Sequence, residues 1–367
     1  MMKIAITNLT NADFYMGIEK EKGLGASDAA VINNANSMSY KGHEVTIFGQ
    51  FLTTTKNDEG VVYAPFMEAQ AKGDWDLLIC NRNPIHYEKF NAKKKVLWMH
   101  DDIDAPVNKG ISGIIDIFDH VVVLSKYHKR RVQTLSEKKL PFIIIPEGIA
   151  DSAVQAQAKS SCREETAEWT FLYASAPFKG LPVLIKKIWS MVKEILPNAK
   201  LRVCSSMKLY GLNQNDVFFK KMYDDMRADP SIIYEPVLTN TEIFDVMSEC
   251  DAMLYPKTFN ETFCNSVNEA LFMGLPVITS RIANLPDLVE DGVNGYTIGG
   301  NPLSEDYAKA FISALGMMIY DEEKYKSMRL HCLSNYHHAL SWLDCTELFL
   351  SKIGDGKERF TELKEDY

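Results

Sequence analysis

Two glutamates in the second half of the chain, Glu261 and Glu269, are its strongest candidates for chemistry. The apolar residues 251–255 before them predict a short strand, and residues 265–273 predict a helix that ends at Gly274. On one continuous helix, eight positions advance about 80° beyond two full rotations, so the two carboxylates would not share a face. We therefore expect Glu261 in the loop after the strand and Glu269 within the helix.

This arrangement predicts an anion site between the two carboxylates. The backbone N–H groups of residues 263–266 would open the helix without partners inside it, so they would point at a bound anion. A carboxylate on each side suits a ligand with hydroxyl groups at both ends and phosphate between them, such as a nucleotide sugar. The alternative is an acidic helix start without a ligand, because carboxylates favour helix N-termini. The strand-loop-helix order around the pair favours the ligand site.

Gly23 and Gly25 form a second candidate phosphate site. They follow the predicted strand 3–7 and precede a helix, where glycine allows close backbone approach and a helix start favours phosphate. A Gly-x-Gly pair also fits a dinucleotide-binding domain. The rest of that fingerprint is missing, however. There is no third glycine, and residues 49–51 after the second strand read Gly-Gln-Phe where the fingerprint has an acidic residue. A nicotinamide-dependent oxidoreductase with two α/β domains therefore stays only as an alternative.

Lys179 and His100 each follow a predicted strand and could face a ligand. Lys179 ends the loop after strand 170–174, where a compact cation could neutralise a leaving diphosphate, although most lysines are simply exposed. His100 could donate a hydrogen bond to a sugar hydroxyl, or it could be bonded within its own loop. The nearby Asp102 and Asp104 have an Asp-x-Asp spacing that could bind a divalent cation. We interpret that spacing as coincidental and expect no metal site.

The composition is that of a globular protein long enough for two domains, with 367 residues of which 46% are hydrophobic and 24% charged. Its seven cysteines are scattered without a Cys-x-x-Cys pair, which predicts a reducing compartment rather than disulfides or zinc. The net charge of −9 offers no broad footprint for nucleic acid. No apolar run approaches the ~20 residues of a membrane span, and the N-terminus becomes polar too soon for a signal peptide. We expect a cytoplasmic protein.

Two basic clusters, at residues 93–95 and 126–131, interrupt the acidic composition. They predict solvated helix faces, which is the interpretation we favour. The alternative is a patch for an anionic lipid surface or a phosphorylated acceptor. In that case the N-terminal domain would make a peripheral contact with a membrane.

Predicted strands alternate with predicted helices in two successive series, the pattern of doubly wound parallel sheets. The strands of the first series are expected at 3–7, 44–48, 77–80, 96–99, 120–124 and 142–145. Those of the second are expected at 170–174, 200–204, 232–234, 252–255, 277–279 and 296–298. Residues 151–168 between them lack a strand signal and predict a linker. Because ligands bind at the carboxyl ends of such strands, we expect the site in a cleft between the two halves.

These motifs, in this order, resemble the retaining family-4 glycosyltransferases (glycosyl transferases group 1), whose GT-B fold has two Rossmann-like domains facing a cleft. The resemblance spans about residues 3–342. It implies an N-terminal acceptor-binding domain at 1–165, a C-terminal nucleotide-sugar donor-binding domain at 166–335, and a final helical segment, 336–367, that crosses back to the first domain. Trp342 follows a serine, as at the usual start of that last helix in the family.

The resemblance also implies a role for each candidate residue. Glu261 would bind the donor sugar and Glu269 the ribose. Lys179 would bind the diphosphate, and His100 would contact the reacting sugar or help to place the acceptor. The catalytic set is then His100, Lys179 and Glu261. The implied donor-binding set is Gly23, Gly25, Ser175, Phe263, Cys264, Asn265, Ser266 and Glu269. The expected activity is a metal-independent transfer with retention of the anomeric configuration, and no cofactor is implied besides the nucleotide-sugar substrate.

One position departs from the family pattern. Many members carry an arginine, a second cation for the diphosphate, where residues 174–176 read Ala-Ser-Ala. Three explanations stay open: Ser175 donates a weaker hydrogen bond, Lys208 or Lys257 supplies the charge, or catalysis is slow. A catalytically inactive or binding-only GT-B protein is the corresponding alternative, and a sugar-nucleotide epimerase or phosphorylase is the nearest alternative enzyme. The donor base, the donor sugar and the acceptor (glycan, lipid or small molecule) are left open.

Overall fold

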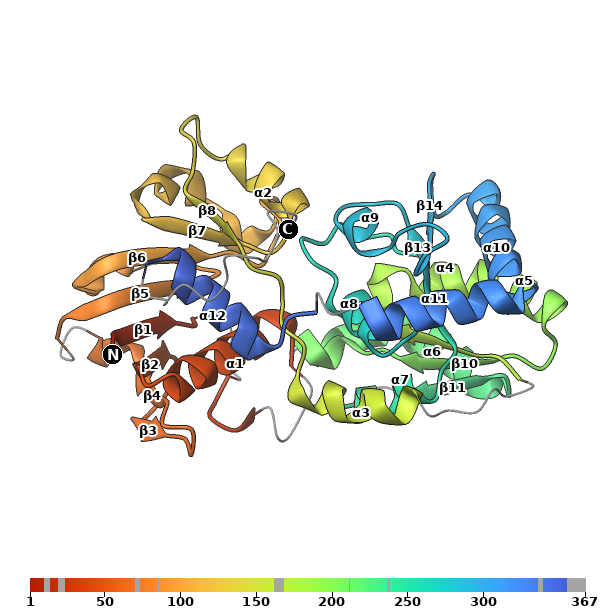
Figure 1. The fold of residues 1–367 in the computed structure, drawn as a ribbon, viewed down its shortest axis with the longest axis horizontal. Coiled ribbons are helices and arrows are strands. Elements are labelled where there is room, and N and C mark those ends of the chain that lie inside the picture. Colours follow the sequence, from red (N-terminus) through yellow and green to blue (C-terminus); the bar gives the residue numbers. More distant parts are fainter. Residues whose placement is uncertain are drawn as a thin grey trace.

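The structure is a computed structural model of the chain. It describes residues 1–9, 14–18, 24–69, 73–84, 86–161, 168–210, 212–235, 238–239, 241–335 and 339–354. Two α/β domains lie side by side, each built on its own sheet (Figure 1). The prediction of two successive domains with doubly wound, mainly parallel sheets is confirmed.

The sheet of the first domain has the strand order β3-β4-β2-β1-β5-β6-β7-β8 and is parallel except for the antiparallel β3–β4 pair. Its strands are β1 (Lys3–Thr7), β2 (Glu44–Gly49), β3 (Thr55–Lys56), β4 (Val62–Pro65), β5 (Trp75–Asn81), β6 (Ala92–Trp98), β7 (His120–Val123) and β8 (Phe142–Ile144). Helix α1 (Ala26–Tyr40) follows β1, and α2 (Lys126–Gln133) follows β7. Consecutive residues of a strand point to opposite faces, and both Ile4 and Ala5 of β1 are fully buried. Both faces of this sheet are therefore covered.

The sheet of the second domain has the strand order β11-β10-β9-β12-β13-β14, and its pairs are parallel. Its strands are β9 (Thr170–Ala174), β10 (Lys200–Cys204), β11 (Ile232–Glu235), β12 (Ala252–Tyr255), β13 (Val277–Ser280) and β14 (Gly295–Ile298). The helices among them are α4 (Leu181–Val183), α5 (Trp189–Ile195), α6 (Lys220–Ala228), α7 (Glu242–Ser248), α8 (Asn265–Phe272), α9 (Leu285–Leu288), α10 (Glu305–Ile319) and α11 (Glu322–Asn335). Phe171, Leu172 and Tyr173 are consecutive in β9 and all fully buried, so this sheet is also covered on both faces.

Helix α3 (Asp151–Ser161) occupies much of the stretch that the sequence predicts as a linker. Its Ala153 and Ala156 belong to the apolar core of the second domain. The Ser160 hydroxyl donates to the backbone carbonyl of Met273 at 2.8 Å. The chain therefore leaves the first domain before α3, and α3 packs on the second domain.

Helix α12 (Trp342–Lys352) returns to the first domain (Figure 1). It begins after Ser341, which forms a capping box with Asp344 and so satisfies amides at the helix start. The Phe349 ring packs on Trp98 with 5.0 Å between ring centroids, and the Thr346 hydroxyl donates to the Asn34 side chain of α1 at 3.0 Å. The end of the described chain is thus part of the first domain's core.

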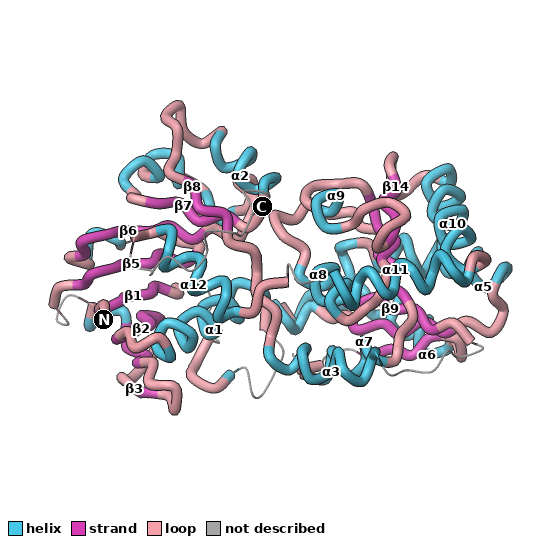
Figure 2. Tube along the Cα trace, in the orientation of Figure 1, coloured by secondary structure: helices cyan, strands magenta, loops and turns pink. Residues whose placement is uncertain are grey.

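The strand order of the second domain determines where a ligand can bind. The strand order reverses between β9 and β12, because β10 and β11 follow on one side of β9 while β12, β13 and β14 follow on the other. Open α/β sheets form a ligand crevice at such a topological switch point. The loops that follow these two strands carry Lys179 and Glu261. Figure 2 shows the two domains side by side, each with strands and helices. Lys179 and Glu261 line a cavity to which residues of the first domain also contribute. Among the described helices, none combines the length and the apolar character needed to cross a bilayer.

Candidate active site

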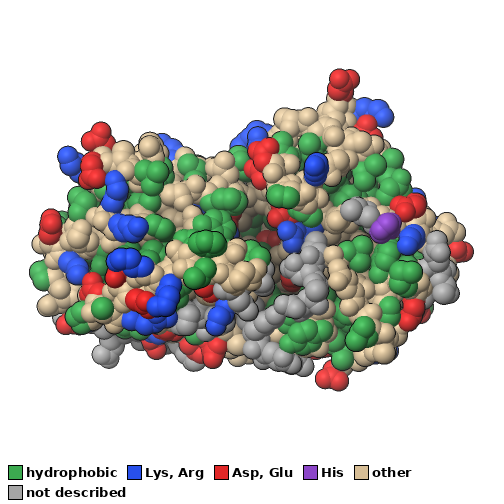
Figure 3. Space-filling view, turned by 180° about the vertical axis from the view of Figure 1, so that it is seen from behind, with side chains coloured by type: hydrophobic (Ala, Val, Ile, Leu, Met, Phe, Trp, Pro, Cys, Tyr) green, Lys and Arg blue, Asp and Glu red, His purple; other side chains and the backbone are tan. Residues whose placement is uncertain are grey.

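A cavity of about 190 Å³ lies between the two domains, in the hollow visible between the lobes in Figure 3. The first domain contributes the start of α1 and Gly148. The second contributes the carboxyl ends of β9 and β10 and the start of α8. The predicted site residues that line the cavity are Gly25, Ser175, Lys179, Glu261, Phe263, Asn265, Ser266 and Glu269. Gly23 lies outside the described residues.

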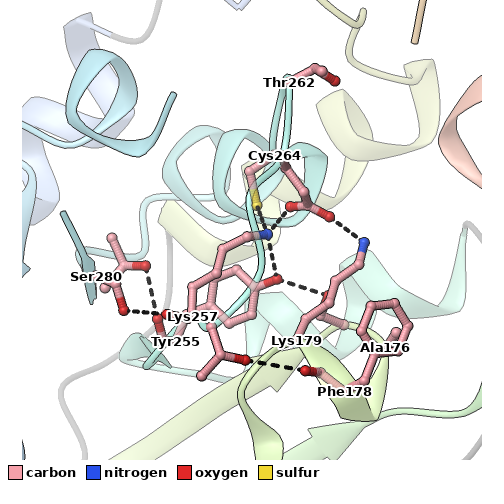
Figure 4. Close-up of polar contacts among 12 residues, drawn as sticks. Ala176, Phe178, Lys179, Tyr255, Lys257, Thr262, Cys264 and Ser280 are labelled. Atoms are coloured by element: carbon pink, nitrogen blue, oxygen red, sulfur yellow. Dashed lines mark hydrogen bonds and ion pairs between the residues drawn. The ribbon is translucent and has the colours of Figure 1, made fainter. Parts of the chain in front are cut away.

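The carboxylate of Glu261 is held between two lysines (Figure 4). Its Oε1 accepts a hydrogen bond from Lys179 Nζ, and its Oε2 accepts one from Lys257 Nζ. The Lys179 and Glu261 side chains are 12% and 14% exposed, whereas Lys257 is fully buried. The structure therefore brings the two residues predicted for sugar and diphosphate into direct contact across the switch point.

The start of α8 is open to the cavity. Cys264 precedes the helix in an extended conformation (φ −110°, ψ 90°) and supplies no side-chain cap, so the amides of the first turn can donate to a ligand. Asn265 and Ser266 of that turn line the cavity. The Asn265 Oδ1 and Ser205 Oγ atoms are buried without a hydrogen-bond partner among the described residues, and Ser205 also lines the cavity. Orphaned polar atoms at a cavity wall indicate a polar ligand or water there.

Glu269 lies within α8, as the spacing predicts, and lines the same cavity. Burial of its carboxyl group raises the pKa of Glu269 to about 8, and the charge of Glu147 adds to the increase. Without a ligand the carboxyl group is therefore largely protonated at neutral pH. Hydroxyl groups that donate to the carboxylate would favour its ionised form.

This pKa predicts a specific pH dependence of stability. The pKa of Glu269 in the folded protein lies above its ordinary value of 4.5. The stabilisation that protonated Glu269 gives the folded state is therefore complete below pH 4.5 and is lost as the pH rises through 8. Relative to a Glu269→Gln variant, the wild-type free energy of unfolding should therefore fall by roughly 1 kcal/mol per pH unit in this window. Urea titrations at several pH values between 5 and 9 measure it. Glu323→Gln on the exposed surface of α11 is the control, and a pH-independent difference for Glu269→Gln would contradict the prediction.

The loop that carries Glu261 also contacts the first domain. Ser125, the N-cap of α2, donates through its hydroxyl to the Thr262 carbonyl at 2.6 Å. The Thr262 hydroxyl donates to the His100 carbonyl, and Phe263 packs against the first domain's core. The position of Glu261 therefore depends on how the two domains meet. The sequence did not indicate these contacts, because their partners are more than a hundred positions apart.

His100 follows β6 and is 8% exposed. Its Nδ1 lies 2.8 Å from Glu147 Oε1, and its buried Nε2 has no hydrogen-bond partner among the described residues. His100 is not among the described residues that line the cavity, so its contact with a sugar stays a prediction. The sequence did not identify Glu147 as a partner of His100, although a charged residue soon after the apolar strand β8 is the signal that could have found it.

The charged clusters of the first domain have partners within that domain. Asp102 and Asp104 share Arg131, which lies 2.9 Å from Asp102. In the first basic cluster, Lys93 pairs with Asp76 at 2.7 Å. The Asp-x-Asp spacing thus accommodates an arginine, and each basic cluster contains a residue whose charge is locally balanced.

Gly25 is the N-cap of α1 with φ −64°, so its conformation does not need glycine's positive φ.

Residues 170–317 match the family model described as "Glycosyl transferases group 1". The matched segment includes Lys179, Glu261 and Glu269. The matched segment covers most of the second domain. The site described above thus lies where strands of the matched segment end.

Named relatives match part of this chain. The D-inositol 3-phosphate glycosyltransferase of Corynebacterium glutamicum is 29% identical over 147 residues, which are 40% of this chain and 34% of the relative. The lipopolysaccharide 1,2-N-acetylglucosaminetransferase of Salmonella typhimurium is 24% identical over 203 residues, 52% of this chain and 51% of the relative. The alignment with the corynebacterial proteins spans about a third of their length.

Solved structures resemble the whole two-domain chain. Sucrose-phosphate synthase from Thermosynechococcus elongatus superposes with a TM-score of 0.75 and 13% identity, covering 96% of this chain and 98% of the other. Anabaena HepE in complex with UDP and glucose has a TM-score of 0.66 and 13% identity, covering 96% and 99%. These likenesses establish the fold. The GT-B architecture expected from the sequence is confirmed.

Proposed function

We propose that this protein transfers a sugar from a nucleoside-diphosphate sugar to a hydroxyl acceptor, with retention of the anomeric configuration and without a metal ion. The observation that carries the proposal is the Lys179–Glu261 pair beside the uncapped start of α8, in a cavity that both domains line. A carboxylate, an ammonium group and free backbone amides are the groups that sugar hydroxyls and a diphosphate need. The second domain's family and the GT-B fold support the same activity.

Each group has a part in the proposed reaction. Glu261 would accept hydrogen bonds from the donor sugar, and Glu269 would accept them from the ribose. The bond between the sugar and the diphosphate breaks through an oxocarbenium-like transition state, while negative charge develops on the leaving phosphate. Lys179 and the amides at the start of α8 would stabilise that charge. The acceptor oxygen forms its bond to the anomeric carbon on the face from which the phosphate leaves, and the leaving phosphate takes the acceptor's proton. Attack on that same face gives retention.

The two-domain cleft suits this chemistry because hydrolysis of the donor is the competing reaction. Closure of the domains would exclude water and bring an acceptor held by the first domain to the sugar. The Ser125–Thr262 contact supports such a coupling, since it joins the first domain to the loop that carries Glu261.

Under this proposal the protein needs no cofactor besides its donor substrate, since Lys179 and the start of α8 supply the positive charge. The acceptor is a glycan, a lipid or a small molecule. A cytoplasmic location, where nucleotide sugars and reduced cysteines coexist, is part of the proposal. A peripheral membrane contact would use the basic cluster of α2 in the first domain.

Nucleotide release from a panel of UDP-, GDP- and ADP-sugars, with and without EDTA, tests the proposal. UDP and ADP accompany solved neighbours of this fold, so their sugars come first. We expect release from one donor, unaffected by EDTA and at least tenfold slower in Glu261→Gln, about the loss of one good transition-state contact. Glu323→Gln, exposed on α11, is the matched control.

The other outcomes are equally informative. Loss of activity with EDTA would contradict metal independence and direct attention to Asp102 and Asp104. Binding of a donor without turnover, with candidate acceptors present, would favour the binding-only alternative. Failure of every nucleotide sugar to bind would show that the proposed function is wrong.

A further inference from the structure

Lys257 has no part in the reaction proposed above. Its side chain is fully buried, and its ammonium group contacts Glu261 Oε2, the Tyr255 hydroxyl at 3.0 Å and Cys264 Sγ at 3.8 Å (Figure 4). An ammonium group has three N–H donors, and these contacts supply an acceptor for each. A buried charge is tolerated only with such partners. Glu261 is the charged partner among them.

The two lysines that share Glu261 differ in their access to a ligand. Lys179 lines the cavity together with Glu261, so an entering anion can reach its ammonium group. Among the described residues, Lys257 does not line that cavity. Lys257 is therefore not the missing second cation that touches the diphosphate. Lys257 can act on a ligand only through the groups that it contacts, and Glu261 is the charged one among them.

Lys257 is also fixed in place. Its backbone carbonyl accepts a hydrogen bond from the Ser280 hydroxyl at 2.6 Å, and its backbone amide donates to the Tyr255 carbonyl at 2.7 Å. The Tyr255 hydroxyl donates to Ser175 Oγ at 2.9 Å. Tyr255 thus connects the Lys257 ammonium group to the loop that leads to Lys179. Lys179 lines the cavity and is 12% exposed, whereas Lys257 is fully buried.

The charges favour an exchange of partners. Burial lowers the pKa of Lys257 to about 7; the nearby Cys264 raises it, and the charge of Lys179 lowers it. A diphosphate that draws Lys179 away from Glu261 would remove this repulsion and favour the charged form of Lys257. Glu261 would then keep one cationic partner while Lys179 serves the phosphate.

We propose that Lys257 is a positioning residue: it holds the Glu261 carboxylate from the buried side, so that Lys179 can exchange its contact with Glu261 for the donor's diphosphate. The proposal rests on the proposed function for the Lys179 step. The Lys257–Glu261 pairing itself does not. It also answers the question of the absent loop arginine, because Lys257 compensates by freeing Lys179 and not by contacting phosphate.

The pairing can be tested by stability alone. Glu261→Gln leaves the buried Lys257 without its charged partner, so the urea midpoint should fall. Adding Lys257→Met removes the stranded charge and keeps an unbranched apolar chain in the same space, so the midpoint of the double variant should rise again. A double variant less stable than Glu261→Gln would overturn the pairing. This arm needs no donor and stands even if the proposed function is wrong.

The release of Lys179 is tested by affinity for UDP, GDP and ADP, measured by calorimetry. Lys257→Met leaves Glu261 with Lys179 as its cation, so the Kd of the nucleotide that binds wild type should rise about tenfold, the loss of a single good contact. Adding Glu261→Gln should restore most of that affinity, because the Glu261 carboxylate then no longer competes with the phosphate for Lys179. A purely structural role for Lys257 would not give this rescue. Lys186→Met, exposed in the same domain, is the control.

Each remaining outcome decides the proposal. An unchanged Kd in Lys257→Met, or a loss that Glu261→Gln deepens, would overturn it. If Lys257→Met does not fold, Lys257→Gln, which can still hydrogen-bond Tyr255, takes its place in the same comparison. If none of the three nucleotides binds wild type, the proposed function fails together with the Lys179 step, and the stability arm alone decides the pairing.

Discussion

Replacing Lys179 with methionine should lower kcat/KM for the active nucleotide sugar at least a hundredfold. Lys179 is the cation at the cavity wall, in contact with Glu261. A fixed donor stabilises the charge that develops on a leaving diphosphate most strongly in a site with little water. Loss of one such donor lowers kcat roughly 10²–10³-fold. Initial rates of nucleotide release with the donor found in the panel measure the effect.

Two comparisons make this result specific to the Lys179 charge. Lys186→Met applies the same change to an exposed lysine of the same domain and should leave the rate unchanged. Lys179→Arg keeps a cation but changes its shape, so it should retain more activity than Lys179→Met. A Lys179→Met enzyme within threefold of wild type would remove Lys179 from the site, whatever the donor.

Replacing Gly180 with alanine should have the second largest effect, on both stability and activity. Gly180 has φ 137°, and a Cβ atom there would lie 2.2 Å from the Pro256 carbonyl oxygen and 2.9 Å from its carbon. The loop of Lys179 and the segment of Lys257 therefore approach each other closely at Gly180, and only glycine, which lacks a Cβ, allows this approach. We expect a loss of about 3 kcal/mol in the free energy of unfolding, since both overpacking and strained backbone contribute.

Activity should fall at least tenfold in the Gly180→Ala variant even where it is folded, because the added Cβ separates Lys179 from Glu261. Urea unfolding and nucleotide release measure the two effects on one preparation. Gly299→Ala is the control, since a Cβ at Gly299 meets no atom within 4 Å and its φ is not positive. If Gly180→Ala matched Gly299→Ala in both measurements, the close approach of these loops would not matter for the site.

Much of the framework could be predicted from the sequence because its signals are local. Strands buried on both faces appear as short apolar runs, and β1, β9, β10 and β12 lie at their expected positions. The spacing of the two glutamates, together with the flanking strand and helix signals, predicted Glu261 in a loop and Glu269 in a helix, and α8 begins where the pattern predicts. Family resemblance then supplied the fold, which the structural comparisons confirm.

Elements with weaker local signals were missed. β4 (Val62–Pro65) is short and ends in proline, which sequence reasoning discounts as a strand. α3 lies in a segment rich in small and polar residues, where two buried alanines are too small to mark a helical face. Both owe their structure to packing: β4 pairs with β2, and α3 rests on the second domain. Local propensity is a weak guide where tertiary contacts decide.

The sequence by itself therefore determined the two α/β domains, the order of their motifs and the residue types of the site. Only the tertiary structure decided the partners: Lys179 meets Glu261 across 82 positions, Lys257 holds the same carboxylate from the core, and Ser125 reaches Thr262 from the other domain. The physical reason is that periodicity and spacing report on neighbours along the chain. Ion pairs and hydrogen bonds of the site depend on which strand ends the sheet brings together, and strand order is set by long-range packing.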